Sequence, residues 1–299
     1  MGHIEMSGNG IKLLERVGEG GMSTVWKAWD ESRGCYVAVK VLAGEFAASG
    51  RDIASFREEE RVMEEMDNPG IVKAYGFEQD GDGCRMIMEY VDGYTFGDLL
   101  RRKQHVGEAD CLLICESVAA ALNVAWNDHG VVHCDIKPEN IMINSEGVVK
   151  LTDLGIFHRY EQREGTLEPP DQVMGTPAYI SPEQVYGDVE VDCRSDIYSL
   201  AATLYHLSTG RTLFPGLGNE DTMRAHCSPT SQARDPRSYR PALSEGFCQL
   251  LESMLVKDRD YRVTNWQDIY QMCLEVEAGQ KFKPRETAAT APSSLLLNQ

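Results

Sequence analysis

The hydrophobic pattern of the chain changes near Asp92, and this change limits the possible folds more than any other feature. Before Asp92, apolar residues form short or alternating runs separated by Gly and Asp, as in an antiparallel sheet. The predicted strands are Ile11–Val17, Thr24–Trp29, Tyr36–Leu42, Ile71–Phe77 and Arg85–Tyr90. After Asp92, the pattern becomes helical. The predicted helices are Ala109–His129, 196–209, 244–256 and 264–277. The 299 residues suffice for two modest domains or one two-lobed domain.

The first part also contains a predicted helix over residues 52–66. Among its acidic residues, Glu59 lies on the same stripe as Phe56 and Met63. An unpaired carboxylate facing inward would be costly. We therefore predict that Glu59 pairs with Lys40, which ends the strand-like run Val-Ala-Val-Lys.

The composition excludes several classes of protein. A net charge of −18 argues against nucleic acid or an anionic membrane as the main partner. The acidity either favours basic substrates or merely keeps the protein soluble, and we prefer the second interpretation. No run of about eighteen apolar residues and no secretory signal is present, so we expect a cytoplasmic chain without a membrane segment. The nine scattered cysteines include no C-x-x-C pair, which indicates neither a disulfide framework nor a zinc site.

Residues 133–140 read His-Cys-Asp-Ile-Lys-Pro-Glu-Asn, and a second acidic turn begins at Asp153 with Asp-Leu-Gly. Asp135 supplies a base for an incoming hydroxyl, Lys137 a cation for a phosphate, and Asn140 with Asp153 oxygen ligands for magnesium. Each residue alone could be a polar surface group. Together they predict phosphoryl transfer.

A glycine-rich turn lies upstream of this loop, between two predicted strands. It contains Gly18, Gly20 and Gly21, and glycines allow a backbone to approach phosphates closely. A dinucleotide-binding turn is disfavoured because a strand follows it, not a helix. By itself such a turn is weak support for a nucleotide site.

The order of these motifs resembles the eukaryotic-type Ser/Thr protein kinases, most closely their bacterial branch, over residues 11–275. The resemblance implies an α+β, bilobal kinase-like fold with a small β-rich N-lobe (11–91) and a mainly helical C-lobe (92–275). We expect an N-terminal extension (1–10) and a flexible tail (279–299). Residues 175–183 resemble the substrate-docking segment of the family.

The resemblance also implies individual roles. Asp135 would be the catalytic base, Lys137 would neutralise the transferred phosphate, and Lys40 would bind the other ATP phosphates while held by Glu59. Asn140 and Asp153 would bind Mg²⁺, with Mn²⁺ as an alternative. The residues that would bind ATP are Val17, Gly18, Gly20, Gly21, Ser23, Val25, Ala38, Lys40, Met88, Glu89, Val91 and Met142.

Within that set, Met88 would limit access behind the adenine, and Glu89 and Val91 would form the hinge. Val25, Ala38 and Met142 would enclose the base. Elsewhere, the resemblance implies that Asp196 braces the catalytic loop, and that Glu183 forms a buried structural ion pair with Arg262. Lys137 and Thr176 indicate a protein substrate with a Ser or Thr acceptor.

Cys134 departs from the family pattern, which usually has Arg at this position. That Arg binds a phosphorylated activation loop in related enzymes, and a neutral thiol cannot. We therefore expect activity that does not depend on activation-loop phosphorylation, although Thr166 is the expected autophosphorylation site. The alternative is that Arg159 or Arg163 replaces the missing Arg.

The sequence thus predicts an ATP- and Mg-dependent Ser/Thr protein kinase. Two alternatives remain: a nucleotide-binding pseudokinase that acts as a scaffold, and a small-molecule phosphotransferase of related fold. If the chain continues past residue 299, it would be the cytoplasmic domain of a longer protein.

Overall fold

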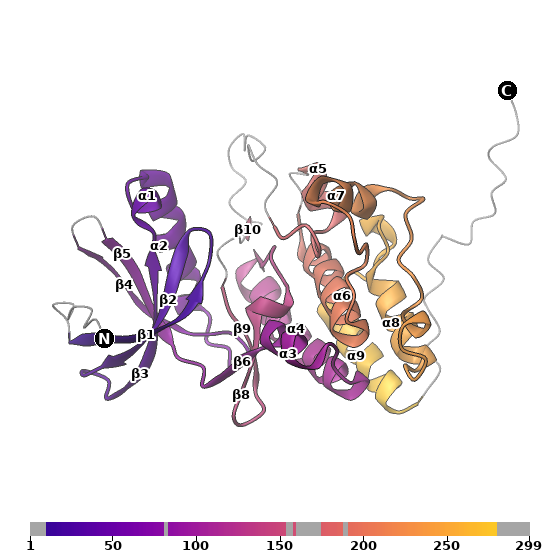
Figure 1. Cartoon of the computed structure of the whole chain (residues 1–299), viewed down its shortest axis with the longest axis horizontal. Coiled ribbons are helices and arrows are strands. Elements are labelled where there is room, and N and C mark those ends of the chain that lie inside the picture. Colours follow the sequence, from indigo (N-terminus) through magenta and orange to yellow (C-terminus); the bar gives the residue numbers. More distant parts are fainter. Residues whose placement is uncertain (1–9, 81–82, 154–157, 160–174, 188–190, 280–299) are drawn as a thin grey trace, which may run out of the picture. The chain divides into compact units, whose positions relative to one another are not determined.

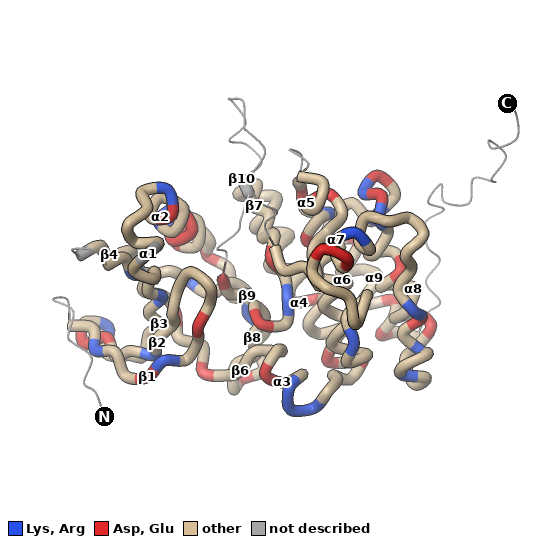
Figure 2. The backbone as a smooth tube through the Cα atoms, turned by 45° about the horizontal axis from the view of Figure 1, so that its top comes forward, with Lys and Arg blue, Asp and Glu red and all other residues tan. Residues whose placement is uncertain are grey.

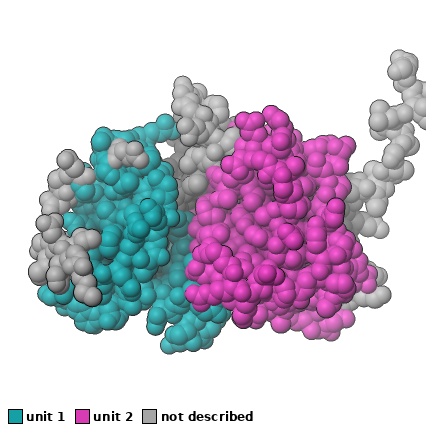
Figure 3. Space-filling view, in the orientation of Figure 1, with its two compact units in different colours: residues 1–95, 141–155 teal, residues 96–140, 156–299 magenta. Residues whose placement is uncertain are grey.

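The computed structural model describes residues 10–80, 83–153, 158–159, 175–187 and 191–279. The chain forms two compact units, residues 1–95 with 141–155 (unit 1) and residues 96–140 with 156–299 (unit 2) (Figure 3). Unit 1 is built on an antiparallel sheet and unit 2 is mainly helical, as Figure 1 shows. The predicted α+β class is confirmed. The lobe boundary expected at residue 91 differs from the boundaries of the units, because residues 141–155 pack with unit 1.

Unit 1 contains a five-stranded antiparallel sheet with the order β1-β2-β3-β5-β4. Its strands are β1 (Ile11–Glu19), β2 (Ser23–Asp30), β3 (Cys35–Leu42), β4 (Ala74–Asp80) and β5 (Gly83–Glu89). Four of the predicted strands are confirmed within two residues at either end. The start predicted for the strand at Ile71 was wrong, because Ile71 forms a separate parallel bridge with Leu151.

The alternation of residues along β3 determines which side chains lie on each face of the sheet. Val37 and Val39 are fully buried in a cluster with Ile11, Ala28 and Ile87. The residues between them, Ala38 and Lys40, point to the opposite face, because successive side chains alternate along a strand.

Helix α2 (Gly50–Glu65) packs against β4, with Phe56 edge-to-face on Phe77 at a centroid distance of 6.0 Å. It begins at Ser49, whose hydroxyl accepts a hydrogen bond from the Asp52 N–H. The short helix α1 (Gly44–Ala47) precedes it. The helix predicted over residues 52–66 is therefore confirmed, two residues longer at its start.

Unit 1 also holds a small sheet that the sequence pattern did not predict. Its order is β6 (Gly93–Thr95), β8 (Ile141–Asn144) and β9 (Val149–Leu151). These strands have three or four residues, too few for a recognisable alternation. Gly93 is required there, because a Cβ atom would collide with the carbonyl oxygen of Ile143.

Unit 2 is built around α6 (Cys193–Thr209), which is buried along almost its whole length. The other helices are α3 (Phe96–Lys103), α4 (Glu108–His129), α5 (Pro182–Tyr186), α7 (Asn219–Cys227), α8 (Glu245–Met254) and α9 (Trp266–Glu277). Short elements complete the unit: β7 (Val131–Val132) paired with β10 (His158–Arg159), and the 3₁₀ turns η1 (Pro138–Asn140), η2 (Pro236–Ser238) and η3 (Arg259–Tyr261).

The four long helices predicted for unit 2 are confirmed, with ends within three residues of the predicted ones. Gly130 and Gly210 end α4 and α6 in the left-handed conformation, with φ of 62° and 71°. Helices α3, α5 and α7 were not predicted.

Among the described residues, α4 is long and apolar enough to cross a membrane by length and composition. Its apolar side chains include buried residues where it packs against α9, and core helices of globular domains meet the same criteria. The expectation that the chain has no membrane segment stays a prediction.

Candidate active site

Lys40 of β3 lies between two carboxylates of unit 1. Its Nζ is 2.7 Å from Oε1 and 3.0 Å from Oε2 of Glu59, and it also contacts Oδ1 of Asp153. The side chains of Lys40 and Glu59 are 8% and 4% exposed, whereas that of Asp153 is 46% exposed. The predicted pairing of Lys40 with Glu59 is present, and Asp153 joins it.

Two carboxylates sharing one ammonium determine the electrostatics of this group. Burial alone would lower the pKa of Lys40, but Glu59 and Asp153 raise it above its ordinary value. Burial raises the pKa of the Glu59 carboxyl to about 7. The Lys40 ammonium lowers this pKa, and the Asp153 carboxylate raises it. The group carries an excess of negative charge with its exposed oxygens on Asp153, an arrangement that favours a bound cation.

The glycine-rich turn connects β1 to β2 in the same unit. Gly18 pairs with Val25 across the two strands, and the N–H of Gly20 donates to the carbonyl of Ser23 at 2.8 Å. A Cβ atom at Gly21 would meet no neighbour within 4 Å. Val17 is half exposed.

The other residues predicted to bind ATP also lie in unit 1. Ala38 of β3 is directly opposite Met88 of β5, and Met142 lies on β8. Glu89 ends β5 and forms an ion pair with Lys150 at 2.9 Å. Val91, just beyond, is buried. The structure thus places every predicted ATP residue in one unit.

The catalytic-loop residues lie in unit 2, grouped around Asp135. Its Oδ2 is 2.5 Å from Lys137 Nζ and 3.3 Å from Asn140 Nδ2, while its Oδ1 accepts from the hydroxyl of Thr176 at 2.7 Å. Lys137 also donates to that hydroxyl at 3.1 Å. Asn140 donates from its amide nitrogen to the backbone carbonyl of Asp135 at 2.9 Å as well as to this carboxylate.

The loop is braced from α6 by Asp196, as the family resemblance implied. Its two carboxylate oxygens accept the N–H groups of His133 and Cys134 at 2.7 and 2.8 Å. Burial raises the pKa of Asp196 to about 6, against the opposing effect of His133 and these two donors. The side chain is therefore an ionised acceptor at neutral pH.

Glu183 and Arg262 form the predicted buried ion pair, with distances of 2.6 and 3.1 Å. Ser195 adds a hydrogen bond to Glu183 at 2.7 Å. Burial alone would raise the pKa of Glu183, but Arg262 and Ser195 hold it below its ordinary value. The pair fixes α5 to η3 and touches none of the catalytic-loop side chains named above.

Gln184 is the residue that the sequence analysis missed. Its side chain is buried, closes the N-terminus of α5 with Ser181, and donates to the carbonyl of Cys134 at 2.8 Å. The Ser-x-x-Gln spacing is a known helix-start signal and could have revealed its capping role. The contact with Cys134 joins segments fifty residues apart and has no local signal.

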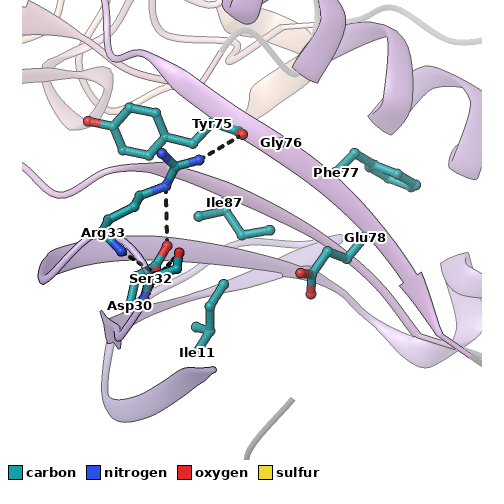
Figure 4. Close-up of a pocket in the computed structure, with 9 residues that line it drawn as sticks. All are labelled: Ile11, Asp30, Ser32, Arg33, Tyr75, Gly76, Phe77, Glu78 and Ile87. Carbon is teal, nitrogen blue, oxygen red and sulfur yellow. Dashed lines mark hydrogen bonds and ion pairs between the residues drawn. The ribbon is translucent and has the colours of Figure 1, made fainter. Parts of the chain in front are cut away.

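The described residues contain no group of three or more His, Cys, Asp or Glu side chains placed to hold a metal. Asn140 and Asp153 nevertheless offer the oxygen donors that Mg²⁺ prefers. A cavity of about 300 Å³ in unit 1, between Arg33, Tyr75 and Glu78, includes none of the predicted site residues (Figure 4).

Several predictions fall on parts of the chain outside the described residues. These are Leu154, Gly155, Arg163, Thr166, the side chain of Arg159, and most of the two terminal segments.

Comparison with known proteins gives consistent matches. The family described as protein kinase domain matches residues 11–274. A probable serine/threonine-protein kinase PknB of Bifidobacterium longum is 34% identical over 266 residues, covering 86% of this chain and 38% of that protein. A probable serine/threonine-protein kinase of Clostridium perfringens is 38% identical over 251 residues, covering 84% of this chain and 36% of the relative.

A third relative is matched over more of its length. Serine/threonine-protein kinase PknA of Mycobacterium tuberculosis is 32% identical over 294 residues, covering 97% of this chain and 66% of that protein. The chain spans little more than a third of the Bifidobacterium and Clostridium relatives.

Proposed function

This chain belongs to the protein kinase family, and we propose that it transfers the γ-phosphate of ATP to a Ser or Thr hydroxyl of a protein substrate. Members of this family use ATP and a divalent metal, which we infer to be Mg²⁺, with Mn²⁺ as a substitute. The observation that carries the proposal is the environment of Asp135, whose carboxylate contacts Lys137, Asn140 and Thr176.

In the proposed reaction, Asp135 orients the acceptor hydroxyl and takes its proton as the new P–O bond forms and the bond to the β-phosphate oxygen breaks. Lys137 neutralises charge on the transferred phosphoryl group. Lys40, held by Glu59, binds the remaining phosphates. Asn140 and Asp153 would hold Mg²⁺, which when bound supplies positive charge to the phosphates.

A transfer assay tests this proposal. The protein is incubated with Mg²⁺, γ-labelled ATP and a generic basic protein, and the labelled amino acid is identified. We expect label on Ser or Thr, and its loss in Asp135→Asn. Labelled Tyr, or label on small hydroxyl compounds only, would contradict the proposal. Nucleotide binding without any transfer would identify a pseudokinase.

The environment of Cys134 supports a second part of the proposal, that activity does not require a phosphorylated activation loop. The residue is 7% exposed and packs with Val132, Val191 and Trp126 in an apolar cluster. A neutral thiol in such a cluster provides no positive charge for a phosphate.

Thr166→Ala tests this second part. Because no phosphate at residue 166 would be needed, we expect a peptide-kinase rate within threefold of the wild-type rate. A loss of more than tenfold would contradict the proposal and favour the alternative in which another basic residue binds the phosphate.

We place the activity in the cytoplasm, in this chain or in the cytoplasmic part of a longer one.

A further inference from the structure

The peptide group between Cys134 and Asp135 is held at both of its polar atoms. Its carbonyl oxygen accepts a hydrogen bond from Nε2 of Gln184 at 2.8 Å. Its N–H donates to Nδ1 of His133 at 3.3 Å. The preceding N–H, that of Cys134, donates to Asp196 at 2.8 Å. The backbone that carries Asp135 is therefore fixed by α5 and by α6.

This fixation maintains an unfavourable conformation. Cys134 has a φ of 66°, in the left-handed region that a residue with a Cβ atom rarely adopts. Such conformations persist only where the surroundings determine them strongly. The N–H of Cys134 donates to Asp196 and its carbonyl accepts from Gln184, and these two hydrogen bonds together supply that restraint.

The orientation of the Gln184 amide is determined by its own helix. Its Oε1 accepts from the N–H of Ser181 at 3.2 Å and from the hydroxyl of Ser181 at 3.0 Å. With the oxygen engaged there, the amide nitrogen must be the atom that faces Cys134. Gln184 as a whole is 8% exposed, so water does not readily replace either contact. Gln184 thus links the start of α5 to the catalytic loop.

We propose that Gln184 is a positioning residue, which aligns Asp135 by holding the Cys134 carbonyl against the start of α5. The inference rests on the proposed function, because it assigns Asp135 the role of base. A neutral amide would then tie the catalytic loop to α5 without any modification of the protein. Gln184 itself contacts neither the carboxylate of Asp135 nor Lys137 in any described hydrogen bond.

Two substitutions separate this role from helix capping. Gln184→Glu keeps an acceptor for Ser181, because Glu also serves in capping boxes, but its carboxylate cannot donate to Cys134. Gln184→Leu removes both interactions at a similar volume. We expect kcat to fall about tenfold in both variants, since small misplacements of catalytic groups carry penalties of this order. KM for ATP should stay within twofold.

The pH profile of Gln184→Glu gives the sharpest readout. Protonation turns the introduced carboxyl into a donor, so its kcat relative to wild type should recover severalfold as the pH falls from 8 to 6. Dividing by the wild-type rate at each pH removes the pH dependence that the two proteins share. Gln184→Leu should show no recovery.

Asn265→Ala is the matched control. The side chain of Asn265 caps α9 by accepting a hydrogen bond from the Asp268 N–H at 2.8 Å, and the substitution removes this cap. It should lower the melting temperature but leave kcat within twofold. Wild-type kcat in both Gln184 variants would overturn the inference. So would a tenfold loss in Gln184→Glu without recovery at low pH. An inactive wild-type enzyme would instead overturn the proposed function.

Discussion

Lys40 and Glu59 come from different elements, β3 and α2, and both side chains are almost fully buried. Removing one partner from such a pair leaves a buried charge uncompensated, which costs more than removing both. Asp153 cannot compensate the charge that remains on Glu59 when Lys40 is removed, because Asp153 is also an anion. The buried pair is therefore expected to couple the stability of unit 1 to its proposed role in binding ATP.

Lys40→Met leaves Glu59 buried without a cation, and we expect it to lower the free energy of unfolding by about 3 kcal/mol. Lys40→Met combined with Glu59→Gln should be more stable than Lys40→Met alone. Urea unfolding followed by circular dichroism measures both values.

The control for this cycle is Lys73→Met. The ammonium of Lys73 pairs with Asp67 at 3.2 Å, but the two side chains are 47% and 94% exposed. Pairs of this kind contribute about 0–1 kcal/mol. Equal losses in Lys40→Met and Lys73→Met, or additive losses in the double variant, would contradict the account.

At the scale of elements, periodicity predicted the long helices, whereas the short helices α3, α5 and α7 and the short strands were missed. The stripe of apolar residues on α2 predicted which glutamate faces inward, because a helix of four turns shows its period clearly. Strands β6, β8 and β9 are too short to show any period. The start of β4 was misplaced because Ile71 and Val72 are buried by their contacts with Leu151, which is distant in sequence.

The residues of the candidate site also differ in how far the sequence alone could predict them. Residues within one motif, such as Asp135, Lys137 and Asn140, could be predicted from their spacing. Asp196, Glu183 and Arg262 could be predicted only through the family resemblance. The bond from Gln184 to Cys134 could not be predicted, because it depends on how α5 packs against the catalytic loop.

At the scale of the whole molecule, acidic residues of the described part of the chain occur in both units (Figure 2). That the net charge of −18 keeps the protein soluble stays a prediction. Buried titratable groups whose pKa differs between the folded and unfolded states link pH to stability.

His226 of α7 is the clearest of these groups. It is fully buried, with Nδ1 2.8 Å from the hydroxyl of Tyr198. Burial and the nearby Lys257 ammonium lower its pKa to about 4 from the ordinary 6.5. Below pH 6.5 the unfolded chain binds a proton that the folded protein excludes until about pH 4. The stability that His226 contributes is therefore complete above pH 6.5 and is lost as the pH falls towards 4.

We expect the difference in unfolding free energy between wild type and His226→Gln to shrink by about 1 kcal/mol from pH 7.5 to pH 5.5. Urea unfolding at the two pH values measures it, at conditions above the isoelectric point of about 4.8. The carboxylates shared by both proteins cancel in the difference. A difference that does not change with pH would show that His226 has no part in the acid sensitivity.

Asp135 is proposed to act in phosphoryl transfer and not in nucleotide binding. The most direct test compares single-turnover transfer to a basic protein with ATP affinity, in wild type and in Asp135→Asn. We expect the substitution to lower the transfer rate about 10²-fold or more, as loss of a general base does, while ATP affinity stays within threefold. Transfer by Asp135→Asn at a rate within tenfold of wild type would contradict it.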